Sequence, residues 1–116
     1  METTIKIPKP YLFILNQVFE LEQKVNKLKE ENSIFRNLDK MRNYFATEAL
    51  SYNQGLIYHN PLGEQYNETR TDCEATITGA NHTNLVIIEV LRPIIYIKLG
   101  STQVVTQKAI VIVQSK

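Results

Sequence analysis

The hydrophobic residues of this chain change their spacing close to its middle. Residues 11–50 contain no glycine or proline and are rich in Glu, Lys and Arg, whereas residues 55–116 carry all four glycines and most of the β-branched residues. The first segment repeats its apolar residues at helical spacing, and the second groups them in short runs separated by turn residues. A helical half followed by a β half predicts an α+β chain rather than alternating βαβ units.

The helical half has the heptad pattern of a coiled coil. Position a falls on Tyr11, Val18, Val25 and Asn32, and position d falls on Ile14, Leu21, Leu28 and Phe35. Apolar residues at alternating steps of three and four lie on one seam of a helix. Pro10 before the run and Gly55 after it predict one long helix over residues 11–54, with residues 1–10 as a tail.

Two kinds of packing would bury this seam. The helix can lie on the chain's own β half, or it can pair with a second copy in a coiled-coil dimer. Nearly four clean heptads favour the dimer, and a polar residue at one a position often fixes register in parallel dimers. The flanking charges do not choose between parallel and antiparallel helices. We therefore expect a homodimer whose contacts are made by Ile14, Val18, Leu21, Val25, Leu28, Asn32 and Phe35.

The second half predicts a small all-β domain over residues 55–116. Strands are expected at residues 56–59, 74–78, 85–91, 94–99 and 104–113, with a polar loop between the first two. In the last strand, Ala109, Val111 and Val113 share one face of the sheet because side chains alternate along a strand. About sixty residues make only a marginal core, so packing against a helix or a second chain would stabilise this domain.

Composition argues against several classes of function. A net charge of +1 is unlike the basic excess of nucleic-acid binders. The single cysteine, Cys73, makes no internal disulfide, and with only two histidines the chain offers little for a metal site. No glycine-rich phosphate loop or nucleophile motif is found, and no apolar run is long enough to span a membrane. We expect a cytoplasmic, non-enzymatic protein without metal or cofactor, which acts by binding other proteins.

Several segments of the β half resemble the C-terminal β domain of the GrpE family. Residues 55–66 (Gly-Leu-Ile-Tyr-His-Asn-Pro-Leu-Gly-Glu-Gln-Tyr) resemble its entry, in which a helix ends at a glycine, and a short strand, a Pro/Gly turn and an aromatic-Asp/Asn pair follow. Tyr66-Asn67 matches that pair. Residues 84–93 resemble the family's following strand, and residues 109–116 resemble its final strand.

The resemblance implies a parallel helical dimer with paired β domains, in which each chain is a truncated, divergent GrpE-like protein. It implies binding to the nucleotide-binding domain of a DnaK-type chaperone and faster release of ADP. The positions that match the family's partner contacts are Tyr66, Glu68, Leu91 and Val113. The helical half is short for the family, and Gln107 stands where the family usually has arginine. These departures leave an alternative, a homo-oligomeric scaffold or adaptor with a GrpE-like β domain and no exchange activity.

Overall fold

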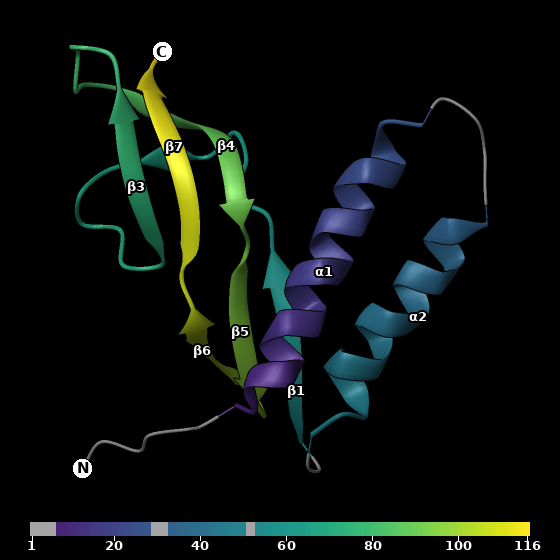
Figure 1. Ribbon diagram of the computed structural model, residues 1–116. Helices are drawn as coiled ribbons and strands as arrows, with labels where there is room; N and C mark the ends of the chain where they lie inside the picture. Colours follow the sequence, from purple (N-terminus) through teal and green to yellow (C-terminus); the bar gives the residue numbers. More distant parts are fainter. Residues whose placement is uncertain (1–6, 29–32, 51–52) are drawn as a thin grey trace, which may run out of the picture.

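A computed structural model describes residues 7–28, 33–50 and 53–116 of the chain. Within these residues two helices precede seven strands (Figure 1). The elements are α1 (Lys9–Asn26), α2 (Ile34–Thr47), β1 (Gln54–His59), β2 (Gln65–Tyr66), β3 (Cys73–Thr78), β4 (Leu85–Arg92), β5 (Ile94–Leu99), β6 (Thr102–Gln107) and β7 (Ala109–Ser115). The predicted α+β order of elements is confirmed.

The prediction of one long helix over residues 11–54 is wrong. The chain forms the two shorter helices α1 and α2, which lie side by side and run in opposite directions (Figure 1). Val18 and Val25 of α1 pack with Leu38 of α2 in one core cluster, and all three are at most 5% exposed. Val18 and Val25, two of the a positions of the heptad seam, are therefore buried inside the chain. A periodic stripe does not specify whether its partner lies in the same molecule.

The prediction that Gly55 ends the helix is wrong. Gly55 lies in β1, eight residues after the last residue of α2. A Cβ atom built on Gly55 would lie 2.0 Å from the backbone oxygen of Ala46 in α2. The glycine therefore allows β1 to approach the end of the preceding helix more closely than any other residue would permit.

The strands form two sheets. Sheet A has the order β1-β5-β6 and is antiparallel, and sheet B has the order β2-β4-β7-β3. In sheet B only the pairing of β3 with β7 is parallel. The strands predicted at residues 56–59, 74–78, 85–91 and 94–99 are confirmed to within two residues. The predicted last strand is divided at Lys108 into β6 and β7, and β2 lies in the segment predicted as loop.

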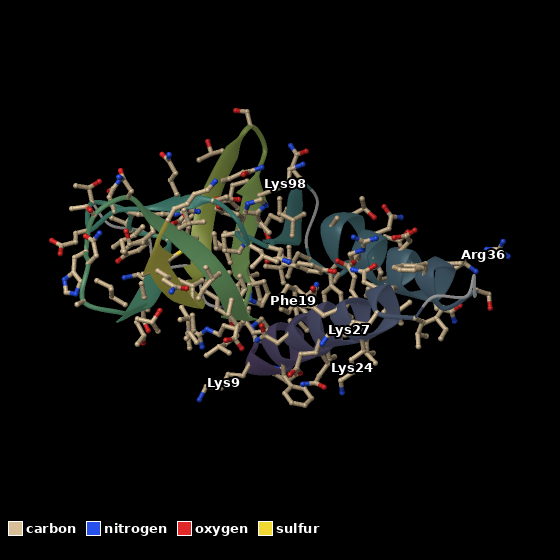
Figure 2. The ribbon with its side chains drawn as sticks, turned by 90° about the horizontal axis from the view of Figure 1, so that it is seen from above. Lys9, Phe19, Lys24, Lys27, Arg36 and Lys98 are labelled. Atoms are coloured by element: carbon tan, nitrogen blue, oxygen red, sulfur yellow. The ribbon has the colours of Figure 1, made fainter. Side chains whose placement is uncertain are left out.

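The core has separate parts on the two faces of sheet A. Ile95 and Ile97 of β5 pack with Leu15 of α1 and Phe45 of α2. The neighbouring residue Ile94 belongs to a second cluster, which contains the inner face of sheet B. Viewed from above, Phe19 lies between α1 and the sheets, whereas Lys9 and Lys24 point away from them (Figure 2). The helices thus cover one face of sheet A, and the core of sheet B packs against the opposite face of sheet A.

Candidate protein-binding surface

Two irregularities in β4 turn apolar side chains out of sheet B. The pairing of β4 with β7 shifts register between Ile87 and Glu89 and again between Val90 and Arg92. At such a bulge two residues of one strand face a single residue of its neighbour, and the local direction of side chains changes. Ile87 and Val90 pack in the core of sheet B, while the extra residues Ile88 and Leu91 are 47% and 54% exposed.

The neighbouring strand extends this apolar area. Ile110 and Ile112 of β7 are half-buried, alternate with the fully buried Ala109, Val111 and Val113, and lie opposite Arg92 and Glu89. They therefore lie on the outer face of sheet B. We call the outward residues of these two strands the β4–β7 face, and they are Ile88, Glu89, Leu91, Arg92, Ile110 and Ile112. An exposed apolar area with charged residues beside it is typical of a protein-binding surface.

The four residues predicted as partner contacts do not form one surface. Leu91 lies on the β4–β7 face, whereas Val113 is 0% exposed and belongs to the core beneath it. Tyr66 packs partly against the same core and pairs with Leu85 at the beginning of β4. Leu91 is six residues further along β4, a separation of roughly 20 Å. Glu68 is exposed in the loop after β2. Of the four, Leu91 and Glu68 are accessible to a partner.

The predicted dimer contacts divide into two groups. Val18 and Val25 are buried within the chain, between α1 and α2. Ile14, Leu21, Leu28 and Phe35 are 40%, 45%, 56% and 37% exposed. Asn32 lies outside the described residues. The exposed Ile14, Leu21 and Leu28 are seven residues apart, so the d positions of α1 and of the turn after it form an outward apolar stripe.

An ion network organises the loop between β2 and β3. Nε of Arg70 donates to Oδ1 of Asp72 at 2.6 Å, and Nη2 donates to Oε1 of Glu64 at 2.7 Å. Nε2 of His59 lies 2.5 Å from the second carboxylate oxygen of Glu64. Partial burial alone would raise the pKa of Glu64 and of Asp72, but the hydrogen bonds from Arg70 outweigh it and both pKa values are lowered. Both carboxylates are thus held in the charged form.

Cys73 lies beside this network, at the beginning of β3. Its side chain is 6% exposed and packs in the core of sheet B. Burial raises the pKa of the thiol to about 11. A thiol in this state is a poor nucleophile, so we assign Cys73 a structural role.

A cleft of about 290 Å³ lies between α2 and β1. Arg42 lines this cleft, forms an ion pair with Glu22 of α1 at 3.0 Å and also bonds Asp39. The hydroxyl of Tyr58 donates to the same Glu22 carboxylate at 2.9 Å. These contacts tie both helices to β1, and we assign the cleft a structural role.

Of the β4–β7 face, only Leu91 is among the residues predicted from the sequence, although β4 carries a signal for the rest. Glu89 and Arg92 are three residues apart in an otherwise apolar strand. Strict alternation would put residues three apart on opposite faces, and two outward polar residues at this spacing require an irregularity between them.

The fold and this face define a class of protein, an α+β chain in which a helical pair packs on a two-sheet β region with an exposed apolar and charged sheet face. No family model, no curated protein and no solved structure matches the chain. Among the described residues, no group of three or more His, Cys, Asp and Glu side chains could hold a metal ion. None of the helices formed by those residues is long and apolar enough to cross a membrane.

Proposed function

We propose that this protein is a GrpE-like co-chaperone that binds the nucleotide-binding domain of a DnaK-type chaperone and promotes ADP release. The observation that carries the proposal is the position of Leu91. The resemblance to the GrpE family implies a partner contact at this residue, and its side chain is 54% exposed on the β4–β7 face. An exposed leucine held out of a sheet by a bulge is well suited to bind a complementary apolar surface.

The mechanism is a population shift and involves no covalent chemistry. The β4–β7 face binds the open form of the nucleotide-binding domain more tightly than its closed form. Binding therefore increases the population of the open form by the ratio of the two affinities, and ADP dissociates faster from that form. We assign this activity to the cytoplasm, in keeping with a single buried cysteine in the sequence.

We further propose that the protein acts as a homodimer. The support for this is the outward stripe of Ile14, Leu21 and Leu28, which are 40%, 45% and 56% exposed. A second copy that packs its own stripe on this one would remove these side chains from water, and the identical stripes suit a twofold interface.

A second candidate function is a scaffold or adaptor without exchange activity. One observation favours it. Gln107 stands where the GrpE family usually has arginine, and its side chain is 8% exposed and bonded to Asn16 of α1. A side chain held in this way is not available to contact a partner.

Stopped-flow release of a fluorescent ADP analogue from the organism's DnaK-type chaperone separates the two functions. We expect the release rate to rise with protein concentration and to saturate. If a folded protein, verified by circular dichroism, leaves the rate unchanged at saturation while still binding the chaperone, the scaffold function is favoured. If it also fails to bind, both functions are excluded for this partner.

A further inference from the structure

The two sheets are joined by one long hairpin that bends at a single residue in each arm. Only Pro93 separates β4 from β5, and only Lys108 separates β6 from β7 (Figure 1). On one side of the bend Arg92 pairs with Ile110, and on the other side Ile95 pairs with Gln107. The angle between sheet A and sheet B is therefore set over a very short stretch of chain.

At this bend, side-chain hydrogen bonds join the two arms in place of hydrogen bonds between their backbones. Nε2 of Gln107 donates to the carbonyl oxygen of Pro93 at 3.0 Å. From the other arm, Nε of Arg92 donates to the carbonyl oxygen of Lys108 at 2.9 Å. Each bond crosses from one arm to the other, so both bending residues have their carbonyl groups satisfied by a side chain of the opposite arm.

Helix α1 contributes to the bend through one residue, Asn16. Nδ2 of Asn16 donates to Oε1 of Gln107 at 3.0 Å, and Nε2 of Gln107 donates back to Oδ1 of Asn16 at 2.9 Å. The two amides thus form a reciprocal pair, and both N–H groups of Gln107 are used because the second binds Pro93. Because Leu15 of α1 is fixed in the core of sheet A, this pair connects the helical layer directly to the bend.

We propose that the Asn16–Gln107 pair is a brace that sets the angle between sheet B and the rest of the molecule. This inference rests on the proposed exchange function, for which it supplies a positioning residue. A protein that opens its partner by binding must present its binding face in a fixed orientation, because a joint that bends freely would let the face bind the closed form of the partner as well as the open form. Leu91 is two residues from Pro93, so the β4–β7 face moves with sheet B about this bend.

The brace predicts different effects on affinity and on the maximal rate of ADP release. Gln107→Ala removes the amide pair and the bond to Pro93, and Asn16→Ala removes the pair while leaving the strand unchanged. Both variants keep the β4–β7 face, so the dissociation constant for the chaperone is expected to change little. The maximal acceleration of ADP release is expected to fall about fivefold or more, because one net hydrogen bond corresponds to a factor of about five and each variant loses at least two bonds. Gln103→Ala, at an exposed glutamine of the same strand, is the matched control.

The orientation itself is measured by double electron–electron resonance. Nitroxide labels are attached at Lys24→Cys on α1 and Thr76→Cys on β3, in a Cys73→Ala background; Lys24 and Thr76 are both exposed. We expect a narrow distance distribution in the otherwise unchanged chain and in Gln103→Ala, and a broader one in Asn16→Ala and Gln107→Ala. Circular dichroism confirms that each variant is folded.

The outcomes distinguish the brace from the proposed function. Unchanged distributions in folded Asn16→Ala and Gln107→Ala would overturn the brace, whatever the exchange assay gives. Broad distributions with an unchanged maximal rate would overturn its role in exchange. If the wild-type protein does not accelerate ADP release, the exchange function fails, and the distance distributions alone decide whether the brace exists.

Discussion

At the scale of single residues, Gly55 has the strictest steric requirement of the four glycines. An added Cβ would lie 2.0 Å from the oxygen of Ala46, which belongs to the backbone of α2 and cannot rotate away. We expect Gly55→Ala to lower the free energy of unfolding by about 2 kcal/mol or more, the cost of overpacking. Urea denaturation measures this change.

Gly79 provides the control for this prediction. Its φ is 86°, and nothing lies within 4 Å of the position that a Cβ atom would occupy. Gly79→Ala should therefore lower the free energy of unfolding by only about 1 kcal/mol, the strain of a left-handed backbone. A cost for Gly55→Ala no larger than that for Gly79→Ala would contradict the close approach of β1 to α2.

Arg70 makes stability depend on pH. It lowers the pKa of Glu64 and Asp72 in the folded state, so these carboxylates contribute stability at pH values above their ordinary pKa values of 4.5 and 3.8. The contribution is lost as the pH falls through the lowered values, where the folded state also becomes protonated. We expect Arg70→Gln to destabilise the protein by about 1 kcal/mol near neutral pH and by less near pH 2.5.

Denaturation of both proteins at the two pH values tests this prediction. The contribution is modest because Glu64 is 37% exposed and water screens its ion pair. A destabilisation by Arg70→Gln that is equal at both pH values would show that Arg70 acts through packing and not through charge.

At the scale of elements, the helical pair explains why Leu38 is buried. It is 1% exposed and packs with Val18 and Val25 of α1 in the same chain. We expect Leu38→Ala to lower the free energy of unfolding by about 3 kcal/mol. Because these contacts are intramolecular, the cost should not depend on protein concentration. A cost that grows on dilution would instead indicate that Leu38 packs against a second chain.

The elements differ in how far the sequence predicts them. The runs of β-branched residues between turn signals identify most strands correctly, because a short run of this kind seldom forms any element other than a strand. The heptads identify helical residues but not the turn between α1 and α2, since apolar periodicity indicates a buried face and does not identify its partner. The break at Lys108 was missed because valine and isoleucine continue on both sides of it.

The candidate surface was predicted only in part for a related reason. Alternation correctly grouped Ala109, Val111 and Val113 on one face, but it does not say which face is inward. The family resemblance, and not alternation, implies contacts at Val113 and Leu91; Val113 is buried, whereas Leu91 is exposed. The exposure of Leu91 and Ile88 depends on the bulges, which follow from the pairing of β4 with β7.

At the scale of the whole molecule, the outward stripe of α1 predicts a dimer. Sedimentation velocity at micromolar concentration should give a dimer for the wild-type protein and a monomer for Leu21→Lys, because the lysine would put a charge into the apolar contact. Leu62→Lys is the control, since Leu62 is 54% exposed in the turn after β1. A wild-type monomer, or a Leu21→Lys dimer as stable as the control, would contradict this interface.

We propose that the β4–β7 face binds a DnaK-type chaperone and thereby promotes ADP release. This proposal is tested most directly by stopped-flow release of a fluorescent ADP analogue in the presence of Leu91→Asp and of Val104→Asp. Val104 is 44% exposed on β6 of sheet A and provides a matched control outside the face. We predict that Leu91→Asp requires at least about tenfold more protein for the same release rate, as expected for loss of a central apolar contact. Val104→Asp should behave like the wild type, and equal release rates with both variants would contradict a role of the β4–β7 face in ADP release.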